Sequence, residues 1–184
     1  METKIRKIDG DSLSVAKKII DDGGLVAFPT ETVYGLGANA FDGEAVKNIY
    51  EVKGRPQDNP LIVHVHKDYD IGQIVYGIPA YAEALAKKYL PGPLTMAFKS
   101  RGNVSPVVSC GLDTVGIRVP SHEGAQRFLK YVDLPIAAPS ANISKHVSPV
   151  TAEHGYAGFL GKVTPIFEGG KSTGGFEGTR LQCL

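Results

Sequence analysis

Two basic segments of the sequence could bind anionic groups, and the first lies between a predicted helix and a predicted strand. Lys53 and Arg55 are two residues apart, and Pro56 and Pro60 would stiffen the loop that carries them. An arginine gives paired hydrogen bonds to phosphate oxygens and a lysine gives a compact positive charge, so the two side chains could clamp a phosphate. The end of a helix also favours cations without any ligand, and this alternative stays open.

The second basic segment places Arg118 inside an apolar strand, between Ile117 and Val119. Either the side chain lies at the edge of the sheet and snorkels to solvent, or it binds an anion in a cleft, because burying a guanidinium without a partner is costly. Thr114 lies four residues earlier and therefore on the same face of the strand. This hydroxyl on the same face favours the anion site.

Two loops rich in polar side chains follow apolar strands. Residues 29–35 (PTETVYG) carry two threonines and a glutamate, and residues 139–144 (PSANIS) carry Ser140 and Asn142. In a layered α/β fold, ligands bind where loops leave the strand ends. Taken singly, each loop is explained better by an ordinary strand-exit, Asx or Ser turn.

Three other patterns suggest chemistry that the surrounding sequence does not support. Residues 35–40 match GxGxxA but do not follow their strand directly, and residues 170–173 end like a phosphate-binding loop but lack its first glycine. His64 and His66 would face the same side of a strand, where we expect them to line a cleft rather than bind a metal, since no third ligand lies nearby. The sequence contains no GxSxG motif, the pattern that would indicate a covalent serine nucleophile.

Strands and helices are expected to alternate along the chain, which is typical of an α/β domain with helices packed on a largely buried sheet. The strand segments are short and apolar on both parities, so both faces of the sheet should be covered. Helices are predicted at residues 12–22, 43–53, 79–89, 123–132 and 151–159, and strands at residues 4–8, 25–28, 61–66, 94–98, 115–119, 135–138 and 163–167.

The composition indicates a single soluble domain. The 184 residues are 42% hydrophobic and 21% charged, and 20 lysines and arginines against 19 aspartates and glutamates give a net charge of +1. No global field therefore attracts nucleic acid or an anionic membrane. Apolar runs of about five residues are too short for a membrane helix, and the N-terminus lacks the apolar stretch of a signal peptide. The two cysteines, Cys110 and Cys183, form no CxxC motif, so we expect a reducing cytoplasm.

The chain resembles the YrdC-type family of L-threonylcarbamoyladenylate synthases in five segments, which are, in order, PTETVYGLG, KGRPQDNPLIVHV, PGPLT, TVGIRVP and PSANIS. The resemblance covers residues 25–179. It implies one YrdC-like α/β domain over residues 1–184, with a twisted mixed sheet and flanking helices around a deep concave cleft. It also implies ATP-dependent synthesis of L-threonylcarbamoyl-AMP from L-threonine and bicarbonate or CO2, with Mg²⁺ accompanying ATP and pyrophosphate released. The product would reach tRNA through a downstream complex that makes the t6A modification.

The same resemblance implies roles for individual residues. On the threonine side these are Thr32, His64 and Arg118. On the ATP side they are Lys53, Arg55, Asn59, Thr114, Ser140, Asn142 and Ser148, and Lys53 and Arg55 are also the expected catalytic residues. The protein is expected to supply no metal ligand. These residue types fit the chemistry, because attack of a carbamate on a phosphate needs positive charge and accurate placement rather than a covalent nucleophile.

The C-terminal sequence departs from the family pattern. Lys145 follows Ser144 where the family has glycine, and Gly178 occupies the position of a serine that contacts threonine. Residues 180–184 then end the chain, and we expect no strand there. A tail that is atypical or truncated from about residue 178 would expose an edge of the sheet and remove part of the cleft wall.

Two other functions therefore stay open. The domain could bind a nucleotide, or RNA weakly, without turnover because of the altered C-terminus. It could also be the corresponding module of carbamoyl-transfer machinery, as in hydrogenase-maturation carbamoyltransferases, although those proteins are far longer and carry zinc-finger and acylphosphatase segments absent from this sequence.

Overall fold

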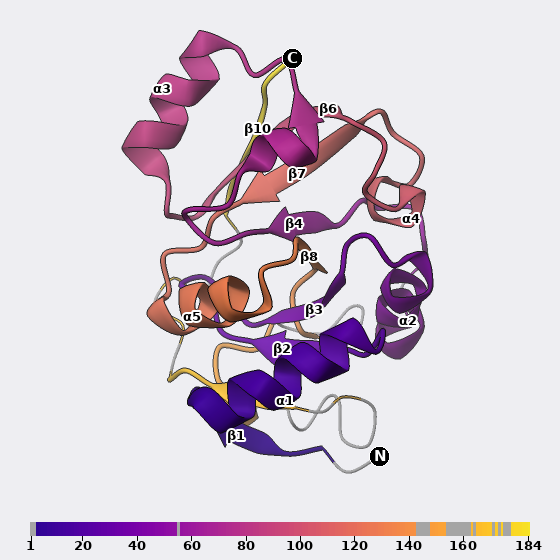
Figure 1. The fold of residues 1–184 in the computed structure, drawn as a ribbon, viewed down its shortest axis with the longest axis vertical. Helices are drawn as coiled ribbons and strands as arrows, with labels where there is room; N and C mark the ends of the chain where they lie inside the picture. The colour runs from indigo at the N-terminus through magenta and orange to yellow at the C-terminus, as the bar shows by residue number, and fades with distance from the viewer. Residues whose placement is uncertain are drawn as a thin grey trace.

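Ten strands of one mixed sheet organise the part of the chain that the computed structural model describes, which comprises residues 3–54, 56–142, 148–153, 163, 165–170, 172, 174 and 178–184. The strands are β1 (Ile5–Lys7), β2 (Val26–Phe28), β3 (Gly35–Asn39), β4 (Ile62–His64), β5 (Val75–Tyr76), β6 (Leu94–Ser100), β7 (Thr114–Arg118), β8 (Ile136–Ala138), β9 (Ile166–Glu168) and β10 (Thr179–Gln182). They run in the order β1-β9-β2-β3-β8-β4-β7-β6-β10, and β5 pairs with β6. The sheet twists from β1 at one end to β10 at the other (Figure 1).

Helices pack on both faces of this sheet. They are α1 (Gly10–Asp21), α2 (Gly43–Lys53), α3 (Ala80–Tyr89), the short α4 (Pro106–Ser109) and α5 (Glu123–Val132), with a 3-10 turn at Ile71–Gln73. Side chains of α1 and α5 form one buried cluster with Val26 and Phe28 of β2, whereas Ala27 belongs to a second cluster with α2. Because successive residues of a strand face opposite sides, β2, β8 and β9 contribute residues to both clusters. Figure 1 shows α1 and α5 on the same side of the strands.

Local capping fixes the helix ends. Asp9 caps α1 in a reciprocal pair with Ser12, in which Ser12 N donates to Asp9 Oδ1 at 2.9 Å and Asp9 N donates to Ser12 Oγ at 3.0 Å. Asp42 caps the start of α2, and Gly54 ends it in the left-handed region with φ of 59°. Helix α2 therefore stops just before the loop that carries the basic residues.

The predicted elements agree closely with the structure where the pattern was strong. Helices at 43–53 and 123–132 are confirmed with the same bounds, and the other predicted strands and helices within the described residues lie within a few residues of their expected places. The predicted helix at 151–159 lies outside the described residues from 154 onward. Strands β3 and β5 and helix α4 were not predicted.

Strand β3 explains the GxGxxA match at 35–40. These residues form a central strand rather than a nucleotide loop, pairing with β2 and β8. A Cβ atom on Gly37 would lie 2.6 Å from Ile136 Cγ2 and 3.0 Å from Phe28 Cε1, so the glycine is required by close packing. The low strand propensity of glycine concealed this strand from the sequence analysis.

The C-terminal residues form a strand, so the expectation of no strand there was wrong. Strand β10 pairs in parallel with β6, from Thr179 opposite Leu94 to Gln182 opposite Ala97, and Cys183 N donates to Ala97 O at 2.8 Å. Pairing with the open edge of β6 determines this strand, and a four-residue sequence window cannot reveal such a partner. Within the described residues, no helix has the length and apolar character needed to cross a bilayer.

Gly178 is the residue that allows β10 to dock. A Cβ atom on Gly178 would overlap the backbone carbonyl of Pro93. We therefore expect Gly178→Ala to displace β10 and to lower the melting temperature by about 3–8 °C, because overpacking against backbone costs about 1–3 kcal/mol. Thermal unfolding followed by circular dichroism measures this shift. Gly10→Ala is the matched control, since nothing lies within 4 Å of a Cβ there; equal melting temperatures for the two variants would contradict the packing at Gly178.

Candidate functional site

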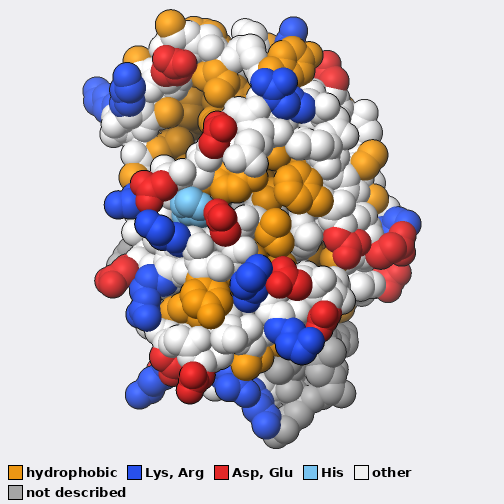
Figure 2. Space-filling view, viewed as in Figure 1, with side chains coloured by type: hydrophobic (Ala, Val, Ile, Leu, Met, Phe, Trp, Pro, Cys, Tyr) orange, Lys and Arg blue, Asp and Glu red, His pale blue; other side chains and the backbone are white. Residues whose placement is uncertain are grey.

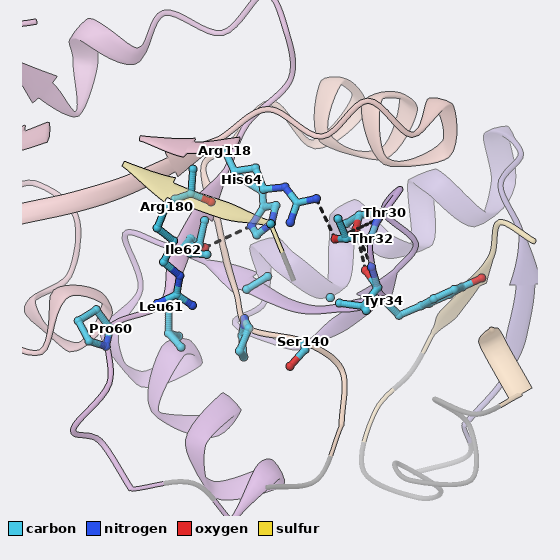
Figure 3. A pocket seen from close by; sticks show the side chains of 16 residues that line it. Thr30, Thr32, Tyr34, Pro60, Leu61, Ile62, His64, Arg118, Ser140 and Arg180 are labelled. Carbon is cyan, nitrogen blue, oxygen red and sulfur yellow. Dashed lines mark hydrogen bonds between the residues drawn. The ribbon is translucent and has the colours of Figure 1, made fainter. Parts of the chain in front are cut away.

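A pocket opens between the ends of several central strands and the loops that follow β2 and β8. It contains about 630 Å³ of empty space, part of which is open solvent. The depth of the predicted cleft stays a prediction. The lining residues are Thr30, Thr32, Val33, Tyr34, Gly35, Pro60, Leu61, Ile62, His64, Thr95, Arg118, Ala138, Pro139, Ser140, Gly178 and Arg180, shown in Figure 3.

The register of the sheet aligns four polar residues across this pocket. His64 of β4 lies opposite Arg118 of β7, Arg118 lies opposite Thr95 of β6, and Thr95 lies opposite Arg180 of β10. Register partners in neighbouring strands project to the same face, with backbones about 5 Å apart. We call these four residues the cross-strand row. Backbone pairing, rather than a loop, determines its spacing.

Arg118 lies between His64 and Thr95 in the row and is buried, with 5% of its surface exposed. Its Nη2 donates to Glu31 Oε1 at 2.7 Å and to Thr32 Oγ1 at 2.8 Å, and Glu31 Oε2 accepts from Ser121 N at 3.1 Å. Its Nε is also buried but has no hydrogen-bond partner within the described structure. Burial excludes the snorkelling alternative, and an unpartnered N–H in a pocket is a donor available to a ligand.

The loop after β2 is a hydroxyl turn that also lines the pocket. Thr30 Oγ1 donates to Val33 O at 2.7 Å and accepts from Thr32 N at 3.2 Å. Ala141 N donates to Tyr34 O at 2.6 Å, which ties this loop to the loop after β8. The ordinary-turn and ligand-site interpretations of residues 29–35 are therefore compatible.

His64 lies in the row as a neutral imidazole. It is 4% exposed, and burial together with the nearby positive charge of Arg118 lowers its pKa to about 3. Its Nδ1 is 3.2 Å from Ile62 O, and its ring packs edge-on against Phe28 with centroids 5.8 Å apart. The histidine therefore lines the pocket without adding charge.

His66 does not share the pocket with His64, so the expectation that both line one cleft was wrong. Strand β4 ends at His64, and His66 Nε2 lies 3.0 Å from Asp133 Oδ1 in a separate depression. The alternation of strand side chains no longer applies once the strand has ended. No group of three His, Cys, Asp or Glu side chains among the described residues is arranged to hold a metal ion.

Lys53 supports the loop after β8 instead of facing the pocket. Its side chain is 2% exposed, and its Nζ donates to the carbonyl oxygens of Ser140 and Asn142 and, at 3.3 Å, to Asn142 Oδ1. Ser140 Oγ donates to Asn142 Oδ1 at 2.6 Å. Ser140 also bridges to Gly35 of β3, so both Lys53 and the sheet hold this serine at the pocket wall.

The structure thus brings together Thr32, His64, Arg118 and Ser140. Of the remaining expected residues, Lys53, Asn59, Thr114, Asn142 and Ser148 do not line the pocket, and Arg55 lies outside the described residues.

For two of these residues, Thr114 and Asn59, the structure explains why they do not line the pocket. Thr114 begins β7 at the opposite end from Arg118 and pairs with Lys99. Asn59 is exposed beside the lining residue Pro60, and its carbonyl accepts from Tyr50 Oη at 3.2 Å.

Sequence reasoning assigned no role to Thr30, Thr95 and Arg180, which do line the pocket. Thr95 ends the PGPLT segment, so that motif contained a signal for it. Arg180 had none, because its place depends on β10.

Known proteins resemble this chain in sequence and in fold. Residues 18–182 match the Sua5_yciO_yrdC family model, which is described as telomere recombination. The chain belongs to the Sua5/YciO/YrdC family. It is 48% identical over 173 residues to the threonylcarbamoyl-AMP synthase of Pyrococcus abyssi, an alignment that covers 94% of this chain and 51% of the relative. The synthase of Bacillus subtilis is 45% identical over 172 residues, covering 93% and 50%. The chain therefore spans about half the length of these relatives.

Solved structures of the Sua5/YciO/YrdC family confirm the mixed α/β fold. The crystal structure of P. abyssi Sua5 complexed with L-threonine has a TM-score of 0.92 and 46% sequence identity, covering 98% of this chain and 53% of that one. Escherichia coli YciO has a TM-score of 0.84 at 21% identity and covers 98% of this chain and 88% of that one, which supports the fold alone.

The neutral state of His64 makes the stability of this Sua5/YciO/YrdC domain depend on pH. Its pKa is about 3 when folded and about 6.5 when unfolded, so between these values the unfolded chain binds the extra proton. Stability is retained above pH 6.5 and falls as the pH drops. We expect the free energy of unfolding to decrease by about 1 kcal/mol more per pH unit in the wild type than in His64→Gln between pH 6 and 4. Urea unfolding at each pH measures both slopes, and parallel slopes would contradict a neutral buried His64.

Proposed function

We propose that this chain forms the catalytic domain of an L-threonylcarbamoyl-AMP synthase. The reaction would join L-threonine, bicarbonate or CO2, and ATP, and release pyrophosphate. The observation that carries the proposal is the buried Arg118 with an unpartnered Nε, next to the Thr32 hydroxyl and a neutral His64. The names of the relatives and the L-threonine complex of P. abyssi Sua5 support the same assignment.

The threonine end of the pocket follows from Arg118. A carboxylate would accept hydrogen bonds from its Nε–H, and Glu31 limits how far the guanidinium can turn. Thr32 Oγ1 accepts a hydrogen bond from the same guanidinium, so polar groups would face the side-chain hydroxyl of the bound substrate. A neutral His64 leaves Arg118 as the positive charge at this end.

The reaction itself needs placement and charge more than a covalent intermediate. The deprotonated amine of threonine would attack the carbon of CO2, so that an N–C bond forms and one C=O π bond opens onto its oxygen. Loss of one amine proton to solvent then leaves the carbamate. A carbamate oxygen would then attack the α-phosphorus of ATP, the bond to the bridging oxygen would break, and pyrophosphate would leave. Holding the two reactants in line provides much of the acceleration in such reactions.

The nucleotide end would use the loop after β8. Ser140 lines the pocket, and Lys53 Nζ donates a hydrogen bond to its carbonyl oxygen. We therefore assign Lys53 as a positioning residue. Mg²⁺ would arrive with ATP as part of the substrate, coordinated largely by phosphate oxygens and water. Arg55, expected at the phosphates, lies outside the described residues.

The product would serve t6A modification of tRNA through a downstream complex in the cytoplasm.

Binding of RNA or nucleotide without turnover was suggested by the expected loss of the last strand. Strand β10 is present and its Arg180 lines the pocket, which removes that reason. The face shown in Figure 2 mixes acidic and basic side chains, consistent with a net charge of +1 and with no strong attraction for RNA.

The direct test is pyrophosphate release from ATP and Mg²⁺. We expect release only when both L-threonine and bicarbonate are present, since the carbamate is the nucleophile. Release in the absence of threonine would contradict the proposed reaction, as would complete silence from a chain that binds ATP and threonine.

Arg118→Ala tests the threonine end. A hydrogen bond to a charged group contributes about 1.5–3 kcal/mol, so we expect the KM for L-threonine to rise by about 10- to 100-fold. The Kd for ATP should change less than about threefold, and that value also shows that the variant still folds. Similar losses for both substrates would contradict a carboxylate site at Arg118.

A further inference from the structure

Arg180 is a second arginine in the pocket, and neither the motifs nor the family resemblance gave it a role. Among the described lining residues, Arg118 and Arg180 carry the positive charges. Arg118 is held by Glu31 at 2.7 Å. Lys53, expected to bind phosphate, does not line the pocket and donates to the carbonyls of Ser140 and Asn142. Arg180 places a second guanidinium at the pocket wall.

The sheet register places Arg180 on the same face as Arg118. Arg180 pairs with Thr95, and Thr95 pairs with Arg118, so the two arginines are two strand spacings apart, or about 10 Å. Their guanidinium groups diverge: that of Arg118 points toward Thr32, whereas the side chain of Arg180 extends toward Leu61 and Pro60 (Figure 3). The two ends of the pocket therefore each have one arginine.

Thr95 lies between the two arginines and contributes an independent observation. Its side chain is 3% exposed, and its Oγ1 is buried with no hydrogen-bond partner in the described structure. An unpartnered buried hydroxyl is unfavourable in the absence of a ligand. Its position in the row makes it a donor for an anion that approaches Arg180.

We propose that Arg180 and Thr95 form an anion subsite that holds a phosphoryl group of ATP at the Pro60 end of the pocket. The subsite rests on the proposed function, in which the carboxylate of L-threonine lies at the Arg118 end and ATP binds in the same pocket. It assigns this role to a residue of β10, the strand that Gly178 allows to dock against β6. Both residues bind the substrate directly; neither transfers a proton or forms a covalent bond.

Binding calorimetry on the full chain tests the subsite with Mg²⁺·ATP, adenosine and L-threonine as separate probes. We expect Arg180→Gln to weaken ATP binding by at least about tenfold and to leave the Kd values for adenosine and L-threonine within about twofold. Arg180→Lys keeps the charge and should recover part of the loss. Arg127→Gln, at an exposed position of α5 outside the pocket, removes the same charge and should change none of the three affinities.

Thr95→Val gives a readout that a purely structural residue would not give. Replacing an unpartnered hydroxyl with a methyl group of similar size should leave the melting temperature unchanged or higher. The same variant should bind ATP about three- to tenfold more weakly. A lower melting temperature with unchanged ATP binding would overturn the role of Thr95.

The outcomes separate this inference from the proposed function. Unchanged ATP affinity in Arg180→Gln, or an equal loss for L-threonine, would overturn the phosphate subsite while pyrophosphate release by the wild type still supports the synthase. An Arg180-dependent ATP affinity in a chain that releases no pyrophosphate would support the subsite and contradict the synthase. A wild-type chain that binds no ATP would overturn both.

Discussion

Burial of the Arg118 guanidinium inside the sheet is the constraint on which the pocket depends. A buried charge requires a partner, and Glu31 supplies it through a 2.7 Å contact. Glu31 in turn accepts from Ser121 N just beyond β7, so one carboxylate joins the loop after β2 to the segment that leads into α5. Thr32 completes the set on the same nitrogen. The loop after β2 is thereby held over the sheet, and the buried Nε–H is left without a hydrogen-bond partner in the described structure.

The sheet does the remaining positioning. Parallel pairing of β4 with β7, antiparallel pairing of β7 with β6, and parallel pairing of β6 with β10 bring four strands from distant parts of the chain into one register. Side chains projecting from a paired backbone have little freedom to drift, which suits a reaction that depends on alignment. On the other side of the pocket, Lys53 secures the loop after β8 by its carbonyl oxygens. Arg118 therefore provides a hydrogen-bond donor for a ligand, and Lys53 shapes one wall of the pocket.

The sequence predicted the elements whose signals are local. Helices α2 and α5 show a strong apolar periodicity, and their bounds were predicted correctly. Arg118 stood out because a charge in an apolar strand needs a reason. Strands β3 and β10 could not be predicted, since glycine-rich or very short segments become strands only through their neighbours. The partners of Lys53 lie 87 and 89 residues away, so its burial could not be read from its position at a helix end.

In the proposed function, the buried Nε–H of Arg118 receives the carboxylate of L-threonine. Nuclear magnetic resonance of ¹⁵N-labelled arginine side chains tests it most directly, with the Arg118 Nε–Hε signal identified by its absence in Arg118→Lys. We expect this signal to shift saturably on addition of L-threonine, with the same Kd that calorimetry gives, and not to shift with adenosine. An unchanged Arg118 signal in a chain that has bound L-threonine would contradict a carboxylate site at this nitrogen.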